Sequence, residues 1–527
     1  MVKVFITLLL FSFFSIAKSR STPSSNSNID WWCNITPHPE PCKHYIGQIN
    51  HYPNIKHKSE FRVMLVQLVL KQVVIMQSEA QDFEQNLVTK KHKVVHNDCL
   101  KLYENTIFHL NRTLEGLHVK KTCSPVDTQT WLSTTLTNIQ TCQTGATDLS
   151  VEDFKVSKLS NNVTKMIRNS LAINMDFMKQ NGDNHKGETK EAFPSWFSRH
   201  DRKLLQSKSS IKAHIVVAKD GSGHFKTVQE ALNSASNRKT KRRFIIHVKK
   251  GVYAENIEVK KNNDNIMLIG DGMAKTIITS HLSVKDGFTT YSSATAGIDG
   301  LHFIARDITF QNTAGPHKGQ AVALRSASDL SVFYRCAIAG YQDTLMAHAQ
   351  RQFYRQCYIY GTVDFIFGNA AVVFQNCNIF ARKPLDGQDN MITAQGRGDP
   401  FQNSGISIHN CQIKAAQDLK PVVDKFKTFL GRPWQQYSRV MVMKTFIDTL
   451  VNPLGWSQWG DSNFAQDTLY YGEYENYGPG SSTSNRVKWP GFHVIKNSAE
   501  ASHFTVTSLL SGHTWLPTST VPFTSGL

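Results

Sequence analysis

The first third of the chain has the hydrophobic pattern of helices. Over residues 61–87, FRVMLVQLVLKQVVIMQSEAQDFEQNL, apolar positions recur at intervals of three and four, and Gly and Pro are absent. The later stretch NDCLKLYENTIFHLNRTLEGL has the same spacing. This pattern predicts an all-α bundle over residues 29–180.

From His214 onward the pattern changes to short β-branched and aromatic runs separated by Gly, Asn and Asp. The phrases VFYRCAI, FYRQCYI and VFQNCNI are variants of one repeat, with cysteines at 336, 357 and 377, and ISIHNCQI repeats it again after a longer insertion. A repeat of about 20 residues with short strands in each copy is typical of a parallel β-helix. The second region, 214–527, is therefore predicted to be all-β.

The segment between these regions, 181–213, is polar and aperiodic, which indicates an exposed linker. It contains the basic sequence RKLL at 202–205, which is either a processing site or an ordinary solvated charge run. The N-terminus has a lysine followed by an apolar run, which predicts a secretory signal over 1–18. An uncleaved signal anchor is the alternative, and no later stretch is apolar enough to span a bilayer.

Equal repeat lengths place residues of the same phase on neighbouring parallel strands, about 4.8 Å apart. The repeated cysteines should then form a ladder. We expect a Cys357–Cys377 disulfide, and a column of buried free thiols is the alternative. The chain has nine cysteines, so at least one stays unpaired.

Two aspartates hold the same phase in consecutive repeats, seven residues after a ladder cysteine. They are Asp343 in GYQDTL and Asp364 in GTVDFIFG. A carboxylate in an apolar run is costly unless it is paired or used. Two adjacent carboxyls shift each other's pKa apart, which supplies one acid and one base or nucleophile. We therefore predict a catalytic pair.

Other polar side chains are candidates for the same site. Gln342 and Gln320 carry amide N–H groups suited to an oxyanion. Arg432, in LGRPW, could keep one aspartate ionised or bind a substrate carboxylate, and Trp434 could stack on a sugar ring.

The net charge and the glycosylation motifs indicate which partners and which cellular compartment to expect. The formal net charge of +18 favours an anionic partner, and without a dense Lys/Arg block with interleaved aromatics, nucleic acid is not expected. Secretion gives meaning to three N-glycosylation motifs. They begin at Asn34, Asn111 and Asn162.

By its motifs the chain resembles the plant pectin methylesterases. GVYAEN, QAVALR, GYQDTL, GTVDFIFGN and LGRPW occur in the order and spacing of that family, and VVAKDGSGHFKTVQEAL opens the domain in the family's way. The resemblance implies a right-handed parallel β-helix for 214–527. Residues 29–180 resemble the invertase and pectin methylesterase inhibitor domain, a four-helix bundle, and this implies bonds of Cys33 with Cys42 and Cys99 with Cys142.

The resemblance also implies roles. Asp364 would attack the C6 methyl ester of galacturonate, and Asp343 would protonate the leaving methanol. Gln342 and Gln320 would hold the oxyanion, with Gln320 also at the substrate. The remaining substrate contacts would be Thr290, Arg432 and Trp434. Met346 stands where the family usually has an aromatic residue, which leaves its effect on binding open.

The expected protein is thus a secreted, cell-wall pectinesterase pro-enzyme that is a monomer and needs no cofactor or metal. Its partners would be methyl-esterified pectin, proteinaceous inhibitors and a subtilisin-like protease that cleaves after Leu205. Two alternatives remain: a pectate-cleaving hydrolase or lyase on the same scaffold, and a non-catalytic carbohydrate-binding or inhibitor protein.

Overall fold

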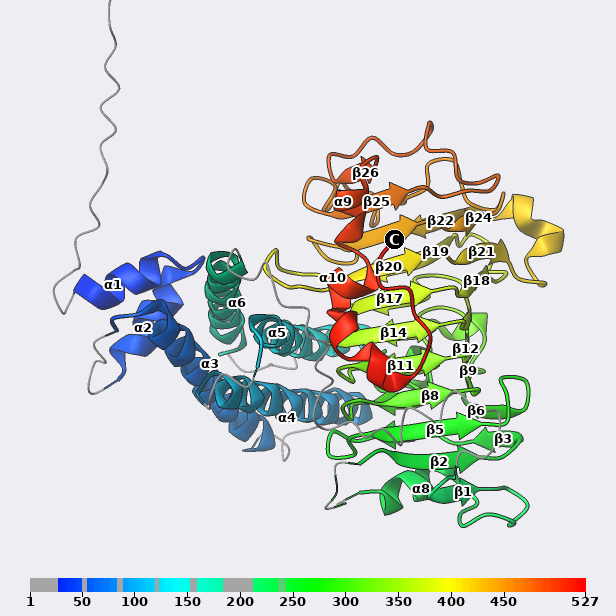
Figure 1. The fold of residues 1–527 in the computed structure, drawn as a ribbon, viewed down its shortest axis with the longest axis horizontal. Coiled ribbons are helices and arrows are strands. Elements are labelled where there is room, and N and C mark those ends of the chain that lie inside the picture. Colours follow the sequence, from blue (N-terminus) through cyan, green and yellow to red (C-terminus); the bar gives the residue numbers. More distant parts are fainter. Residues whose placement is uncertain are drawn as a thin grey trace, which may run out of the picture.

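A computed structural model describes residues 27–49, 55–82, 89–118, 123–151, 159–182, 212–236, 238, 240 and 242–527. The predicted signal peptide and the RKLL sequence lie outside these residues. Among the helices described, none is long and apolar enough to cross a membrane. The chain forms a helical part and a β part that lie side by side (Figure 1).

The helical part contains a bundle of four long helices preceded by two short ones. Its elements are α1 (Ser27–Asn34), α2 (Pro39–Gly47), α3 (Lys58–Asp82), α4 (Lys90–His118), α5 (Pro125–Asp148) and α6 (Ser160–Gly182). Most of the apolar positions of α3 are buried, among them Phe61, Leu65 and Val69. Helix α5 begins with a capping box, in which Ser124 and Asp127 satisfy each other's backbone N–H groups. The bonds Cys33–Cys42 and Cys99–Cys142 are both present, as expected.

The β part is a parallel β-helix of three sheets, which confirms the predicted fold. The first sheet contains β1 (Ile215–Val217), β2 (Phe244–Val248), β5 (Ile266–Gly270), β8 (Ile304–Arg306), β11 (Ser331–Tyr334), β14 (Arg351–Arg355), β17 (Ala371–Gln375), β20 (Gly405–His409), β23 (Arg439–Met443), β25 (Tyr470–Tyr474) and β26 (Phe492–Val494). The second contains β4 (Ile257–Val259), β7 (Ala296–Ile298), β10 (Leu324–Ser326), β13 (Leu345–Ala347), β16 (Ile366–Gly368), β19 (Asn390–Gln395) and β22 (Thr428–Gly431). The third contains β3 (Gly251–Ala254), β6 (Thr276–Ser280), β9 (Thr309–Asn312), β12 (Ala337–Ala339), β15 (Tyr358–Gly361), β18 (Asn378–Ala381), β21 (Gln412–Ala415) and β24 (Phe446–Ile447).

Short helices close the ends and one side of this coil. They are α8 (Val228–Ser234), α9 (Ser498–Ser502), α10 (Val506–Leu510) and α11 (Leu516–Ser519), with 3-10 turns η2 (Val284–Asp286), η3 (Pro316–Lys318), η4 (Lys420–Lys425) and η5 (Gly512–Thr514). Helix α8 packs against the interior at the N-terminal end through Val228 and Leu232. The C-terminal helices cover the outer face of the first sheet (Figure 1).

The repeated phrase becomes a set of stacked layers. The isoleucines at 338, 359, 379, 413 and 447 pair directly on successive strands of the third sheet. The rings of Phe333, Tyr354 and Phe374 stack inside the coil at centroid distances of 4.6 and 4.8 Å. One coil therefore equals one sequence repeat, which fixes the phase of every residue between the layers.

The predicted Cys357–Cys377 disulfide is absent from the structure, in which both are buried free thiols. The ladder itself is present, and each sulfur has polar partners other than a second sulfur. The Cys357 Sγ donates to Phe333 O at 3.2 Å, and the Cys357 N–H donates to the Cys377 Sγ at 3.4 Å. Side chains in one phase of parallel strands point the same way, so stacking and hydrogen bonding satisfy these thiols without a covalent bond.

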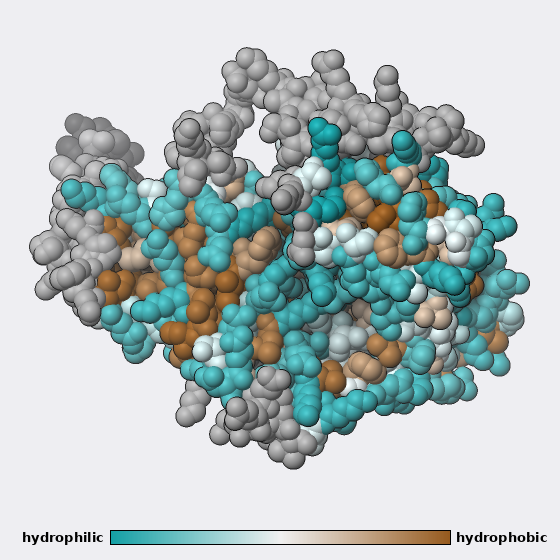
Figure 2. All heavy atoms as spheres, turned by 90° about the horizontal axis from the view of Figure 1, so that it is seen from below, coloured by the Kyte–Doolittle hydropathy of each residue, from teal (hydrophilic) through white to brown (hydrophobic). Residues whose placement is uncertain are grey.

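On one face of the molecule, the helical part and the β-helix differ in surface hydropathy. Seen from below, the helical part presents a band of apolar residues, whereas the β-helix is mostly hydrophilic (Figure 2). Val74 and Ile75 of α3 are among the exposed apolar residues of the helical part. The helical part meets the β-helix through α4 and α5, whose ends reach the coil (Figure 1).

Candidate active site

The two predicted aspartates occupy equivalent turns of consecutive coils. Leu345 pairs with Ile366, so Asp343 and Asp364, each two residues earlier, share a register position at the start of β13 and β16. Both have a left-handed backbone, with φ of 59° and 51°. Asp adopts this conformation more readily than most residues, so the turn itself favours the residue type found there. The sequence prediction that the pair meets across one inter-strand step agrees with this register.

One arginine holds one of the two carboxylates. The Arg432 guanidinium, just after β22, donates from Nε to Asp364 Oδ1 at 2.9 Å and from Nη2 to Asp364 Oδ2 at 2.6 Å. Such a bidentate pair fixes both the charge and the orientation of the carboxylate. The guanidinium also lies over the Trp459 ring, 4.5 Å from its centroid. The two aspartates are thus chemically unequal.

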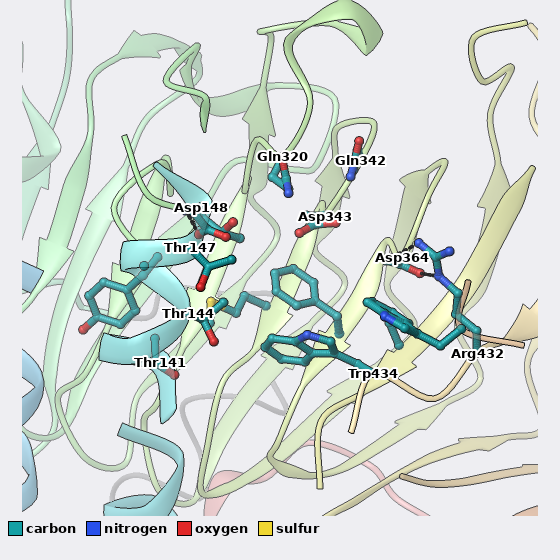
Figure 3. A pocket seen from close by; sticks show the side chains of 17 residues that line it. Thr141, Thr144, Thr147, Asp148, Gln320, Gln342, Asp343, Asp364, Arg432 and Trp434 are labelled. Carbon is teal, nitrogen blue, oxygen red and sulfur yellow. Dashed lines mark hydrogen bonds and ion pairs between the residues drawn. The ribbon is translucent and has the colours of Figure 1, made fainter. Parts of the chain in front are cut away.

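All seven predicted catalytic and substrate-binding residues line one cavity of about 300 Å³ (Figure 3). They are Thr290, Gln320, Gln342, Asp343, Asp364, Arg432 and Trp434. The two glutamine amides lie on the same side of the cavity as Asp343 in the close-up view (Figure 3). The Trp434 ring packs edge-on against Phe367, with centroids 6.0 Å apart, so it forms a wall.

Burial and charge separate the behaviour of the two acids. Asp343 is 8 % exposed and Asp364 6 %. Burial, then the charges of Asp364 and Asp148, raise the pKa of Asp343 well above its usual value. Burial also raises the pKa of Asp364, but its hydrogen bonds and charge interaction with Arg432 oppose that rise. This difference favours the proton on Asp343 and the charge on Asp364.

The helical part forms the other wall of the cavity. Thr141, Thr144 and Asp148 of α5 line it together with Asp343 and Asp364 (Figure 3). The Asp148 Oδ2 accepts a hydrogen bond from the Thr290 N–H at 2.9 Å, and burial raises the pKa of Asp148. The C-terminal end of α5 therefore lines the same cavity as the two aspartates.

Buried polar contacts along α5 hold this arrangement. Asp329 of the β-helix is fully buried and paired with Arg351 through two contacts of 2.9 Å. From α5, the Trp131 Nε1 donates to Asp329 at 3.3 Å and Asp127 pairs with Arg351 at 2.8 Å. From α4, the Arg112 guanidinium lies over the Trp131 ring at 4.1 Å.

Further contacts continue towards the cavity. The Asn369 Nδ2 donates to Thr137 Oγ1 at 2.9 Å, and Thr141 Oγ1 is hydrogen-bonded to the His348 Nε2 at 2.8 Å. Lys101 of α4 reaches the buried Asp299 at 3.3 Å, and burial lowers the pKa of that lysine to about 8. The docked face of the helical part is thus mainly polar.

A second hollow, of about 840 Å³, adjoins the first. The two share Gln342 and Arg432, and the second extends over Lys427, Leu454 and Trp489 without lining residues from the helical part. A long polymer chain could therefore continue from the catalytic cavity along the β-helix surface.

Some functional positions had no distinctive sequence signal. Tyr291, Phe367 and Trp459 line the cavity, and Asp148 reaches it from another domain. Phe367 lies inside GTVDFIFGN, Trp459 inside the aromatic stretch GWSQW and Tyr291 directly after Thr290, so Asp148 is the position that no motif indicated. Trp456, in the same GWSQW stretch as Trp459, is a core residue whose Nε1 donates to Glu473 at 3.2 Å.

The predicted modification sites lie on the helical part. Asn34 and Asn111 are exposed and Asn162 is half-buried. Glycosylation at these positions stays a prediction. Within the described ranges, no group of three or more His, Cys, Asp or Glu side chains is arranged to hold a metal ion.

Comparisons with known proteins agree with both parts of the chain. The profile of the family described as Pectinesterase matches residues 214–513, and that of Plant invertase/pectin methylesterase inhibitor matches 27–173. The chain is 56% identical over 517 residues to "Probable pectinesterase/pectinesterase inhibitor 33" of Arabidopsis thaliana, covering 96% of this chain and 87% of that one. It is 51% identical to "Pectinesterase 2" of Citrus sinensis, covering 99% and 98%. Among solved structures, it is similar to "Pectin methylesterase from Carrot", at 56% identity and a TM-score of 0.60, over 61% of this chain and 100% of that one.

Proposed function

Because the chain belongs to the pectinesterase family and carries an N-terminal inhibitor domain, we propose that its catalytic pair removes methyl esters from pectin through an acyl-enzyme on Asp364. The pectinesterase activity itself follows from the family. The proposal concerns how these residues perform it, and how the helical part controls it.

In the proposed first half-reaction, an Asp364 carboxylate oxygen attacks the C6 carbonyl carbon of a methyl galacturonate unit. The oxyanion that forms accepts hydrogen bonds from the side-chain amides of Gln342 and Gln320. The intermediate then collapses, its bond to the methoxy oxygen breaks, and the Asp343 carboxyl gives its proton to the leaving methanol. The product is an acyl-enzyme on Asp364.

In the second half-reaction, the Asp343 carboxylate takes a proton from a water molecule, whose oxygen attacks the same carbon. Collapse frees Asp364 as a carboxylate and leaves the galacturonic acid unit, with Asp343 protonated again. Arg432 keeps Asp364 ionised and aimed, and Trp434 and Thr290 contact the sugar. Met346 lines the cavity close to this sugar, where an aromatic ring is usual in the family.

The unequal environment of the two in-register aspartates is the observation that supports this division of roles. Arg432 contacts Asp364 on both oxygens, whereas Asp343 lies among carboxylates that raise its pKa. The opposite assignment would make Asp343 the ionised nucleophile, although the bidentate contact with Arg432 is made by Asp364.

The test measures methanol release from highly methylated pectin by the 206–527 fragment, a length that corresponds to the carrot enzyme. Asp364→Ala is expected to abolish release while leaving the thermal transition within a few degrees. Asp220→Ala, which removes an exposed carboxylate in the loop after β1, is the matched control and should retain activity. Turnover by Asp364→Ala at the wild-type rate would end the mechanism. Chain shortening of pectate instead of methanol release would support the hydrolase or lyase alternative.

We propose further that the helical part inhibits the enzyme in the uncleaved chain. The support is that α5 occupies one wall of the catalytic cavity and brings Asp148 to Thr290, a substrate-binding residue in the proposed mechanism. A polysaccharide cannot enter while α5 is docked. Cleavage at RKLL by a subtilisin-like protease would permit release, and separate inhibitor proteins with this helical fold would bind the same face.

The place of action follows from chemistry and sequence together. The leader, the disulfides and the polymeric substrate support secretion to the cell wall. A basic protein would be retained near its polyanionic product, with affinity that falls as salt rises. Elution of the native protein from cell-wall material by salt, rather than by detergent, would be the expected result.

A further inference from the structure

The third sheet lies on the side of the molecule away from the described helices α1–α6 (Figure 1), and the burial pattern along β15 and β18 places a row of aromatic residues on its outer face. Tyr358 and Tyr360 project from β15 and Phe380 from β18. The rings of Tyr360 and Phe380 are stacked, with centroids 4.9 Å apart and planes 10° apart. Tyr358 is 36 % exposed, and its ring is 6.2 Å from that of Phe380 at 19°. We call these three residues the aromatic platform.

The strand on one side of the platform carries only small side chains. Tyr358 pairs with Ala337 and Tyr360 with Ala339, both on β12. Side chains in one column of a parallel sheet repeat about every 4.8 Å, which is also the spacing of stacked rings. A methyl group reaches only a short way from the sheet, so the space above the two alanines can admit a ring that continues the stack. Tyr360 and Phe380 are both half-buried, so part of each ring remains accessible.

Cationic side chains surround the platform. Lys414 follows Phe380 in the same column of the sheet, on β21. Arg382 comes directly after β18, and its guanidinium lies over the Tyr341 ring at 3.8 Å. Lys383 is exposed beside it, and Asp418 is the acid that pairs with Arg382, at 3.1 Å. This set carries three positive charges against one negative charge.

We propose that the aromatic platform is a second carbohydrate-binding site, which holds a uronic-acid polysaccharide apart from the catalytic cavity. Sugar rings present C–H faces that stack on aromatic rings, and the carboxylates of a polyuronate meet Lys414, Lys383 and Arg382. A neutral glycan would use the rings but not the charges, which is why the occupant is a uronate polymer. The inference does not depend on the roles assigned to Asp343 and Asp364.

The position of the platform gives it a distinct use. The cavity lined by Asp343 and Asp364 opens beside the second sheet next to α5, whereas the platform is on the third sheet, on the side away from the helices that the structure describes. The uncleaved chain can therefore bind its polymer while the catalytic cavity is covered. Release of the helical part would then expose the active site of an enzyme already located on its substrate.

The test uses the full-length chain and polygalacturonate, with binding measured by titration calorimetry at 0.15 and 0.5 M NaCl. Tyr358→Ala/Tyr360→Ala is expected to weaken binding at least tenfold at both salt concentrations, because stacking is not screened. Ala339→Phe fills the space above Tyr360 without removing a ring, and should weaken binding to a similar degree. Lys383→Ala/Lys414→Ala should weaken it at 0.15 M and much less at 0.5 M.

The matched control is Trp31→Ala, which removes an aromatic side chain of similar exposure (39 %) from α1. It should leave the affinity unchanged, and all variants should keep the wild-type thermal transition. Unchanged affinity in both platform variants would overturn the proposal. An equal loss of affinity for an uncharged galactan would overturn the choice of a uronate, and a fall in molecular mass on Tyr358→Ala/Tyr360→Ala would assign the platform to contact between copies of the chain.

Discussion

Trp131 offers the most direct test of whether docking of the helical part silences the enzyme. Its side chain is 5 % exposed, lies under Arg112 and donates to the buried carboxylate of Asp329. The apolar core of the bundle is built from other residues of α5, such as Leu132 and Leu136. Trp131→Ala should therefore weaken docking and leave the bundle folded.

The magnitude follows from what the substitution removes. Buried tryptophans at the centre of interfaces contribute about 2–4 kcal/mol when truncated to alanine. Each 1.4 kcal/mol is a factor of about ten, so the docking equilibrium should shift by a factor of about 30 to 1,000. In Trp131→Ala, the buried Asp329 carboxylate keeps both hydrogen bonds with Arg351 and is not left unpaired. The loss of docking free energy should therefore stay within this range.

The assay compares methanol release by three proteins: the 206–527 fragment, the uncleavable full chain carrying Arg202→Ala/Lys203→Ala, and that chain with Trp131→Ala added. The uncleavable chain should be nearly silent, and Trp131→Ala should raise its activity by up to the factor above, limited by the activity of the fragment. Trp31→Ala, on the distant α1, should have no effect.

Two results would refute this reasoning. If the uncleavable chain is as active as the fragment, the docked α5 does not block the substrate. If the uncleavable chain is inactive and stays inactive with Trp131→Ala while its bundle remains folded, the inhibition does not come from the docking contacts described here.

Three more predictions concern the site and the cysteine ladder. Arg432→Gln should lower kcat at least about 100-fold. Because Arg432 lowers the pKa of Asp364, its loss should also move the acid limb of the pH–rate profile to higher pH. An acid limb that does not move would contradict the assignment of Asp364 as the ionised nucleophile. Burial raises the pKa of Asp148 in the docked chain, so docking is favoured while Asp148 is protonated and weakens as pH rises through that raised pKa. The activity of the uncleaved chain should therefore rise with pH more steeply than that of the fragment. Asp148→Asn should remove this difference in pH dependence between the two proteins. Thiol titration of the unfolded, unreduced protein should find the five free cysteines of the structure, whereas three would indicate a disulfide in the ladder.

The shared register of the two aspartates could be predicted from sequence because a β-helix converts repeat length into position. Once Cys336 and Cys357 define successive coils, the aspartates seven residues later must share a register, and the structure places them so. The bundle disulfides came from family resemblance, since spacing alone permits several pairings. The ladder cysteines show the limit, because equal spacing suits a disulfide and a column of hydrogen-bonded thiols alike.

The docking of α5 could not be read from the sequence, since its partners are more than 100 residues away. Trp131 meets Asp329, and Thr141 meets His348, through contacts that no local pattern encodes. One signal was present. Helix α5 carries many threonines; the hydroxyls of Thr137 and Thr141 donate to carbonyls one turn earlier in the helix, and their oxygens can still accept a hydrogen bond from another part of the chain.

The helical part acts on the active site through charge as well as by covering it. Asp148 adds a third carboxyl to a cavity that contains Asp343, Asp364 and one guanidinium, and its charge is among the causes that raise the pKa of Asp343. A neutral methyl ester brings no such charge. The departure of α5 would therefore open the cavity and also remove the charge of Asp148 that raises the pKa of Asp343. The same carboxyl that fits the pocket when protonated is repelled by the pair when ionised. Docking therefore depends on the protonation of Asp148, and the charge of Asp148 in turn raises the pKa of Asp343, the acid of the proposed mechanism.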